Sequence, residues 1–146
     1  MPKPPNADIA SHVTENFLMI DDPYRFSGIF AFLFSTGNIH DVASLYTNDA
    51  SLIGLDGKQH CGRAAIAEYL GHFLLQGLAL RHVIRSAIVH SENALLINDF
   101  QLLSQKFVVC SGICVTVLRR DSDKGWRSMI ENNAYTDWHA VGRTNA

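Results

Sequence analysis

The sequence is poor in charged residues. Of its 146 residues, 18% are Asp, Glu, Lys or Arg, whereas 47% are hydrophobic. The formal net charge of −2 gives no electrostatic basis for binding nucleic acid. A chain of this length forms one domain with a sizeable core. With so few charges to cover that core, we expect a partner or a second copy of the chain to bury some apolar surface.

Long apolar runs are absent as well. No run reaches the roughly 18 residues that a membrane span requires. The N-terminal stretch "MPKPPNADIASH" lacks the apolar centre of a signal peptide. The sequence therefore predicts a cytoplasmic protein that does not insert into a membrane.

The cysteines and histidines form no metal-binding pattern. Cys110 and Cys114 lie four positions apart in one predicted strand, which is too far for a disulfide, and Cys61 is remote in sequence. The seven histidines include no pair at helical His-x-x-x-His spacing. There is also no phosphate-binding loop, dinucleotide fingerprint or nucleophile elbow. We therefore expect reduced thiols, no metal and no cofactor.

Helices are predicted in the first half of the chain. Asp22 and Pro23 provide an N-cap and a first helical residue, apolar residues follow at helical spacing, and Gly37 ends the helix. A second short helix begins at Asn38 and reaches Tyr46. A strand over about 50–55 is closed by the turn dipeptide at 56–57. "GRAAIAEYLGHFLLQG" then predicts a third helix.

The second half of the chain predicts four long strands. They are "LALRHVIRSAIVH", "ALLINDFQLL", "KFVVCSGICVTVLRR" and "WRSMIENNAYTDW". Helices followed by a meander indicate an α+β fold, with N-terminal helices packed on a strongly curved, mostly antiparallel sheet that forms a cone-shaped cavity. Residues 12–138 are expected to form this single domain, between a loose arm at 1–11 and a loose tail at 139–146.

Several of these segments resemble one known family. The most specific are "TGNIHDVASLYTNDASLI" and "CGRAAIAEYL", supported by "RHVIRSAIVHSENALL" and "DKGWRSMIENN". They are similar to the SnoaL-like and ketosteroid isomerase-like proteins, which share the fold of nuclear transport factor two. The resemblance implies a small-molecule cavity and a homodimer formed through the sheet. It does not choose among isomerases, dehydratases, cyclases, hydrolases and noncatalytic binders.

The proton-transfer groups of ketosteroid isomerase are not carried over. The resemblance places its shuttle acid, its tyrosine and its protonated acid on Gly54, Phe30 and Thr116. Of these three residues, only Thr116 offers a polar group, and that group is a weak hydroxyl donor. A one-residue shift would bring Asp56 nearer, but the dipeptide at 56–57 is better explained as a turn.

His82 is the first candidate for chemistry. Strand alternation places it on the face opposite Arg81 and Arg85, which belong to solvent or to a subunit interface. Scytalone dehydratase-like members of this superfamily carry a histidine at a similar strand position, but the acid that accompanies it there falls around Ser35 in this sequence, and a lone histidine on an apolar face is more often structural. If Asp99 shares the cavity, the two form an acid–base pair; if Asn98 faces inward instead, it can only orient a ligand.

The last strand carries a second polar cluster. Strict alternation predicts two faces, one with Trp126, Ser128, Ile130 and Asn132, and the other with Arg127, Met129, Glu131, Asn133 and Tyr135. The second set could line a pocket or a dimer interface, with the interface slightly favoured. Glu131 is the one acid in this strand that could replace the missing base.

The sequence thus predicts a homodimeric domain that binds a small, largely apolar molecule. If it is an enzyme, we expect cofactor-free isomerisation, dehydration or cyclisation of a carbonyl compound; the alternative is a noncatalytic ligand-binding or dimeric assembly module. A cavity in which His82 and an acid converge would favour the enzyme. The expected catalytic residues are His82 and Asp99. The expected ligand-binding residues are Phe30, Leu52, Gly54, Phe73, Thr116 and Tyr135.

Overall fold

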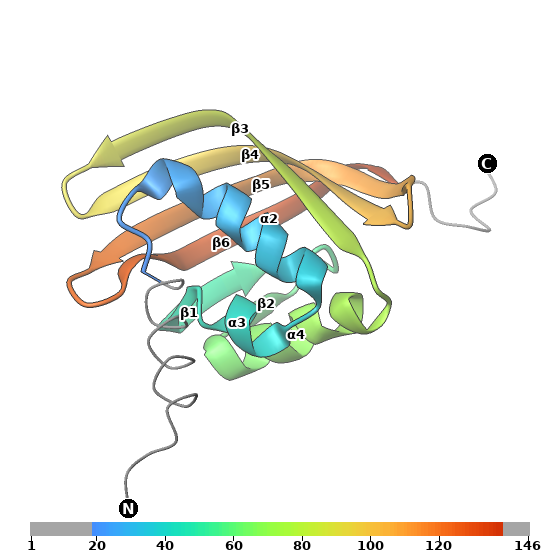
Figure 1. The fold of residues 1–146 in the computed structure, drawn as a ribbon, viewed down its shortest axis with the longest axis horizontal. Helices are drawn as coiled ribbons and strands as arrows, with labels where there is room; N and C mark the ends of the chain where they lie inside the picture. The colour runs from blue at the N-terminus through green and yellow to red at the C-terminus, as the bar shows by residue number, and fades with distance from the viewer. Residues whose placement is uncertain (1–18, 139–146) are drawn as a thin grey trace, which may run out of the picture.

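The computed structural model describes residues 19–138. The predicted arm at 1–11, the first residues of the predicted domain and the predicted tail at 139–146 lie outside the described residues. The strands of the described part form a curved sheet, and the helices lie against one of its faces (Figure 1). The α+β class predicted from the order of helices and strands is confirmed.

The sheet contains six strands in the spatial order β2-β1-β6-β5-β4-β3. Their bounds are β1 Tyr46–Ile53, β2 Gln59–Cys61, β3 Ala79–His90, β4 Asn93–Ser104, β5 Phe107–Asp121 and β6 Gly125–Trp138. Every neighbouring pair is antiparallel except β1 and β6, which are parallel. The long strands β3 to β6 curl without closing, and this curl gives the sheet a concave face (Figure 1).

The helix α2 (Phe26–Thr36) lies across the concave face of the sheet (Figure 1). It follows the short 3-10 helix η1 (Pro23–Arg25), where the Asp22 side chain accepts a hydrogen bond from the Tyr24 amide at 2.9 Å. Gly37 ends α2 in the left-handed conformation, as the sequence predicted. The remaining helices, α3 (Ile39–Ala43) and α4 (Arg63–Leu75), pack on each other near β1 and β2.

Aromatic residues of α2 form the centre of the core. Phe26, Phe30 and Phe34 are spaced by four residues, so their rings stack along one side of the helix, with centroids 6.2 Å and 6.3 Å apart. Phe30 also meets Tyr46 of β1 edge-on at 5.9 Å. These rings lie between the helices and the sheet, and all four are buried.

The first strand begins earlier than the sequence indicated. The helix predicted to reach Tyr46 ends at Ala43, and Tyr46 opens β1 instead. The reason is tertiary pairing, since the Ser128 amide of β6 donates to the Leu45 carbonyl at 2.8 Å. The short strand β2 was not predicted, because three residues are too few to show an alternating pattern.

A β-bulge changes the faces of the last strand. Leu118 pairs with Ser128 but Val117 pairs with Ile130, so one extra residue of β6 lies between the two pairs. Ser128 is fully buried, whereas Ile130 is 50% exposed. The prediction that these two residues share a face was therefore wrong. Downstream of the bulge Glu131 is buried and Asn133 is half-buried, and both face inward.

Candidate functional site

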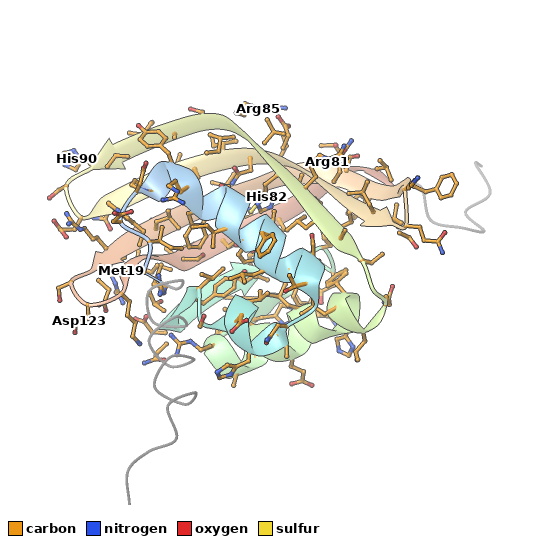
Figure 2. The ribbon with its side chains drawn as sticks, viewed as in Figure 1. Met19, Arg81, His82, Arg85, His90 and Asp123 are labelled. Atoms are coloured by element: carbon orange, nitrogen blue, oxygen red, sulfur yellow. The ribbon has the colours of Figure 1, made fainter. Side chains whose placement is uncertain are left out.

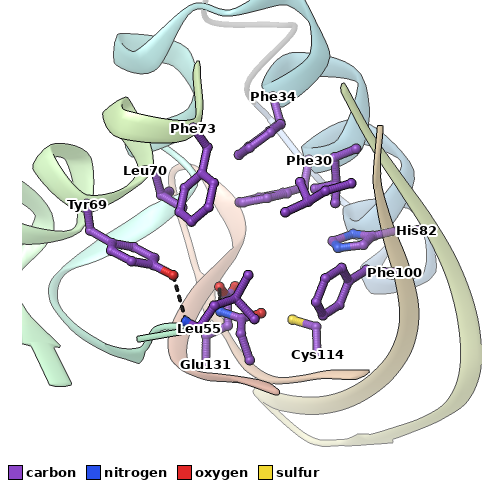
Figure 3. A pocket seen from close by; sticks show the side chains of 13 residues that line it. Phe30, Phe34, Leu55, Tyr69, Leu70, Phe73, His82, Phe100, Cys114 and Glu131 are labelled. Atoms are coloured by element: carbon purple, nitrogen blue, oxygen red, sulfur yellow. Dashed lines mark hydrogen bonds between the residues drawn. The ribbon is translucent and has the colours of Figure 1, made fainter. Parts of the chain in front are cut away.

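A small cavity lies between the concave face of the sheet, α2 and α4 (Figure 3). Its volume is about 50 Å³, taken as the space open to the centre of a water molecule. It is half-enclosed and mainly apolar, and a larger ligand would extend out of it toward solvent. The lining residues are Phe30, Phe34, Leu55, Tyr69, Leu70, Phe73, Leu80, His82, Phe100, Leu102, Cys114, Glu131 and Asn133.

Glu131 is the acid of this cavity. Its side chain comes from β6 just after the bulge and is buried among apolar groups. The Tyr46 hydroxyl lies 3.2 Å and 3.1 Å from its two oxygens and donates to them, and Asn133 Nδ2 donates at 2.9 Å. Burial raises the pKa of the Glu131 carboxyl, and the hydrogen bonds from Asn133 and Tyr46 only partly offset that effect. The site thus holds a carboxyl that is easier to protonate than an exposed one.

His82 reaches the cavity from β3. Its ring stacks on Phe30, with centroids 5.7 Å apart and planes 16° apart. Figure 2 shows Arg81 and Arg85 on the opposite side of the strand, as the alternation predicted. Burial lowers the pKa of His82 to about 4, and a hydrogen bond with the Ser27 backbone acts weakly in the other direction. The imidazole is therefore neutral at neutral pH. Within residues 19–138, no side chain or backbone group is placed to form a regular hydrogen bond with its buried Nδ1 atom.

Tyr69 extends from α4 toward the turn that follows β1. Its hydroxyl oxygen accepts a hydrogen bond from the Leu55 amide at 2.7 Å (Figure 3). The pKa of Tyr69 is raised to about 12, mainly by burial, and the bond from the Leu55 amide acts against this rise. The phenol thus stays protonated throughout the neutral range and remains a hydrogen-bond donor.

Three of the predicted site residues meet in the cavity, namely Phe30, Phe73 and His82. Leu52 and Thr116 are buried in the core but do not line the cavity. Thr116 lies beside it, since its hydroxyl is 3.3 Å from the sulfur of Cys114. Gly54 also lies outside the lining, although it adjoins Tyr69.

The predicted His82–Asp99 pair is not formed. Asp99 pairs across the sheet with Val83, whereas His82 pairs with Phe100, so the two side chains lie on opposite faces. Asp99 instead binds Arg85 through an exposed ion pair of 2.6 Å. The inward residue is Asn98, which accepts a hydrogen bond from the Ser27 hydroxyl at 2.8 Å. Tyr135, the remaining predicted contact, is 51% exposed and does not line the cavity.

Sequence reasoning missed the partners that surround Glu131. The acid itself was considered as a substitute base, but Tyr46 was assigned to a helix end. Tyr46 and Glu131 are 85 residues apart in sequence, and they meet because β1 pairs with β6 in parallel. No local pattern reveals such a pairing. The inward position of Cys114 was predictable from the sequence, because alternation along β5 puts it on the same face as Thr116.

Among residues 19–138, no group of three or more His, Cys, Asp or Glu side chains is arranged to hold a metal ion. Within the same residues, no helix has the length and apolar character needed to cross a membrane.

Comparison with known proteins identifies the fold. No family model matches the chain, and no curated protein sequence matches it. Solved structures do match it. One is a proposed calcium/calmodulin-dependent protein kinase type II association domain from Thiobacillus denitrificans, with a TM-score of 0.71 and 18% identity, covering 82% of this chain and 98% of that chain.

Two further structures point to the same fold. A nuclear transport factor two-like protein with a cystatin-like fold, from Novosphingobium aromaticivorans, gives a TM-score of 0.65 at 18% identity and covers 94% of this chain and 92% of that chain. A proposed dehydratase of the same family from Streptomyces avermitilis gives 0.63 at 15% identity and covers 92% of this chain and 99% of that chain. The chain therefore has the fold of the nuclear transport factor two-like proteins, as the sequence resemblance implied. At these identities the likeness shows the fold alone.

Proposed function

We propose that the chain binds a small, largely apolar carbonyl compound in this cavity and moves a proton on it without a cofactor. The observation that carries the proposal is Glu131, a carboxyl buried in an otherwise apolar cavity, with its pKa raised by that burial. Acids and bases tuned toward neutrality are the groups that proton-transfer enzymes use. The reaction is an isomerisation, a dehydration or a cyclisation.

Each polar group of the site has a distinct role in this proposal. Glu131 takes the proton from carbon and returns it to the ligand. Tyr46 and Asn133 hold its carboxyl in place, since both donate hydrogen bonds to it. His82 is neutral and its imidazole lines the cavity beside Phe30, so it offers a polar but uncharged edge to the ligand. The carbonyl compound must be largely apolar, because aromatic and aliphatic side chains make up most of the wall.

The lining also favours an uncharged ligand. Among the described residues, no Lys or Arg lines the cavity, so nothing there would neutralise a carboxylate or phosphate. An anion would have to lose its hydration next to Glu131, which is costly for like charges in a low-dielectric site. Compounds with a ketone or aldehyde group and a short hydrocarbon skeleton fit better.

The experiment begins with a thermal-shift screen of small ketones, aldehydes and their carboxylic acid counterparts. The neutral compounds should raise the melting temperature, and the acids should not. Turnover of the compounds that bind is then followed for the wild type and for Glu131→Gln, which keeps the shape of the side chain but cannot accept the proton. We expect a loss of at least about 100-fold in turnover. The matched control is Glu68→Gln, an exposed position on α4. Equal turnover in Glu131→Gln and wild type would reject the role of Glu131.

A second candidate function is assembly through the outer face of the sheet, the face opposite the helices. Rows of aliphatic side chains cross this face from strand to strand, for example Leu95, Val117 and Ile130. Ile130 is 50% exposed and Val83 is 58% exposed. So much aliphatic surface on one face is typical of a contact between proteins. The similar structure from Thiobacillus denitrificans, proposed to be an association domain, supports the same idea.

We propose a second copy of this chain as the occupant of the outer face, because a symmetric dimer would pair each aliphatic row with its own copy. Sedimentation of the wild type should give a dimer. Ile130→Lys should shift it to a monomer, since a lysine there would be buried without a partner. Leu75→Lys, at an apolar position that is 89% exposed on α4, is the matched control and should remain dimeric. A wild type that sediments as a monomer at high concentration would contradict this assignment.

A further inference from the structure

The phenol of Tyr69 fills the place where residue 54 would carry a side chain. A β-carbon built on Gly54 would lie 2.5 Å from Cζ and 2.7 Å from the hydroxyl oxygen of Tyr69. Both separations are shorter than any normal van der Waals contact between such atoms. Position 54 therefore needs glycine for space. The position at which the related isomerases carry their acid is occupied here by a hydroxyl group that comes from α4.

The hydrogen of this hydroxyl is available. Tyr69 accepts a hydrogen bond from the Leu55 amide, so its oxygen uses a lone pair in that contact and keeps its own hydrogen. Among residues 19–138, no acceptor is hydrogen-bonded to that hydrogen. The Asp56 carboxylate also lies beside Gly54, and its hydrogen bonds run to the Lys58 amide and the His60 ring. A donor that lines a cavity and has no acceptor of its own is suited to binding a ligand.

The ring of Tyr69 is fixed on two sides, so the hydroxyl has a defined position. His60 stacks on it with centroids 4.3 Å apart and planes 28° apart. Phe73 meets it edge-on at 5.2 Å. In addition, the hydrogen bond from the Leu55 amide holds the hydroxyl oxygen in place. A donor held by packing and by a hydrogen bond needs little reorganisation when a ligand arrives.

We propose that the Tyr69 hydroxyl donates a hydrogen bond to the carbonyl oxygen of the bound ligand and is its main anchor and charge stabiliser. This role rests on the proposed function of the cavity, and it assigns the hydrogen-bond donor for the carbonyl oxygen of the ligand. The C–H bond next to the carbonyl breaks, its proton goes to Glu131, and the electron pair moves onto the carbonyl oxygen. Tyr69 stabilises the negative charge that collects there. The hydrogen bond from the Leu55 amide polarises the phenol and makes it a better donor.

The test compares two ligands of nearly equal shape, cyclohexanone and methylenecyclohexane, which lacks the oxygen. Their dissociation constants are measured by ligand-observed NMR for the wild type, Tyr69→Phe and Tyr24→Phe. One net hydrogen bond should raise the affinity of the wild type for cyclohexanone by about two- to tenfold over that of Tyr69→Phe. Tyr69→Phe should therefore lower the preference for cyclohexanone, defined as the ratio of the two dissociation constants, by that factor, while binding of methylenecyclohexane stays unchanged. Tyr24→Phe is the control, because it removes the same hydroxyl oxygen at a position on η1 that is 55% exposed.

The outcomes separate this role from the proposed function. If both compounds bind and Tyr69→Phe retains the preference, Tyr69 is not the donor, although the cavity still binds apolar ligands. If neither compound binds the wild type, the proposed function fails and the role of Tyr69 fails with it.

The hydroxyl also holds Leu55, so Tyr69→Phe could loosen the turn that follows β1. The second variant therefore keeps the hydroxyl and replaces Tyr69 by 3-fluorotyrosine, whose phenol is more acidic and donates more strongly. The preference for cyclohexanone should then increase above that of the wild type. A role confined to holding the turn would leave the preference unchanged, and that result would overturn the proposal.

Discussion

Replacing His82 by Gln should remove a large part of the protein's sensitivity to mild acid. The imidazole is buried between Phe30 and the sheet, and its pKa is lowered to about 4 from an ordinary value of 6.5. The unfolded chain therefore binds this proton well before the folded protein does. A neutral His82 contributes stability that is fully present above pH 6.5 and is lost as the pH falls toward 4.

The size of the effect follows from the difference between the two pKa values. That difference is 6.5 minus about 4, or about 2.5 pH units, and each unit corresponds to about 1.4 kcal/mol. Between pH 7 and pH 4 the contribution of His82 to the free energy of unfolding should fall by about 3 kcal/mol. This is a substantial part of the roughly 5–15 kcal/mol that stabilises a typical domain.

Urea unfolding followed by circular dichroism at pH 7, 6, 5 and 4 measures this effect. Other titrating groups, including Asp49, Asp56 and Asp121, are shared by both proteins, so they cancel when the two free-energy curves are subtracted. The difference between the wild type and His82→Gln should change by about 3 kcal/mol across this range. Leu75→Gln, at a position on α4 that is 89% exposed and carries no titrating group, should give a curve parallel to the wild type. Parallel curves for His82→Gln would refute the burial argument.

Two further predictions concern Glu131 and Gly54. Because burial raises the folded pKa of Glu131, it contributes stability at low pH that is lost as the pH rises through the folded value. In urea unfolding, the free energy of unfolding of Glu131→Gln should rise relative to that of the wild type from pH 4 to pH 8. A constant difference between the two free energies would contradict this. Gly54→Ala should cost about 1–3 kcal/mol and displace the Tyr69 ring. Gly28→Ala, at an open position on α2, should instead stabilise by about 0.5–1 kcal/mol. Equal effects of the two alanines in urea unfolding would show that Gly54 is not crowded.

The helices and the inward face of β3 could be predicted from the sequence because local signals define them. Asp22, Pro23 and Gly37 mark the ends of the first helical segment by capping chemistry that needs no tertiary contact. The alternation around His82 is regular from Arg81 to Ile84, so its direction was predictable. The loose arm, the tail and the cytoplasmic location stay predictions.

The chemistry of the site depends on long-range pairing and could not be predicted in the same way. A single extra residue in β6 reverses which side chains face inward, and no sequence signal marked that bulge before Glu131. Asn98 and Asp99 are adjacent polar residues in one strand, so alternation alone allowed either of them to face inward. The resemblance placed the shuttle acid of ketosteroid isomerase on Gly54, but only the packing of α4 shows that the Tyr69 ring occupies the space of a side chain at position 54.

The most direct test of the account is deuterium exchange into a bound ketone. In D₂O, the wild type should speed the replacement of hydrogen by deuterium at the carbon next to the carbonyl of cyclohexanone, as measured by proton NMR. Glu131→Gln should bind the ketone and leave the exchange at the rate seen without protein. If the ketone binds and exchange is no faster with the wild type than with Glu131→Gln, then Glu131 moves no proton and the cavity is only a binding site.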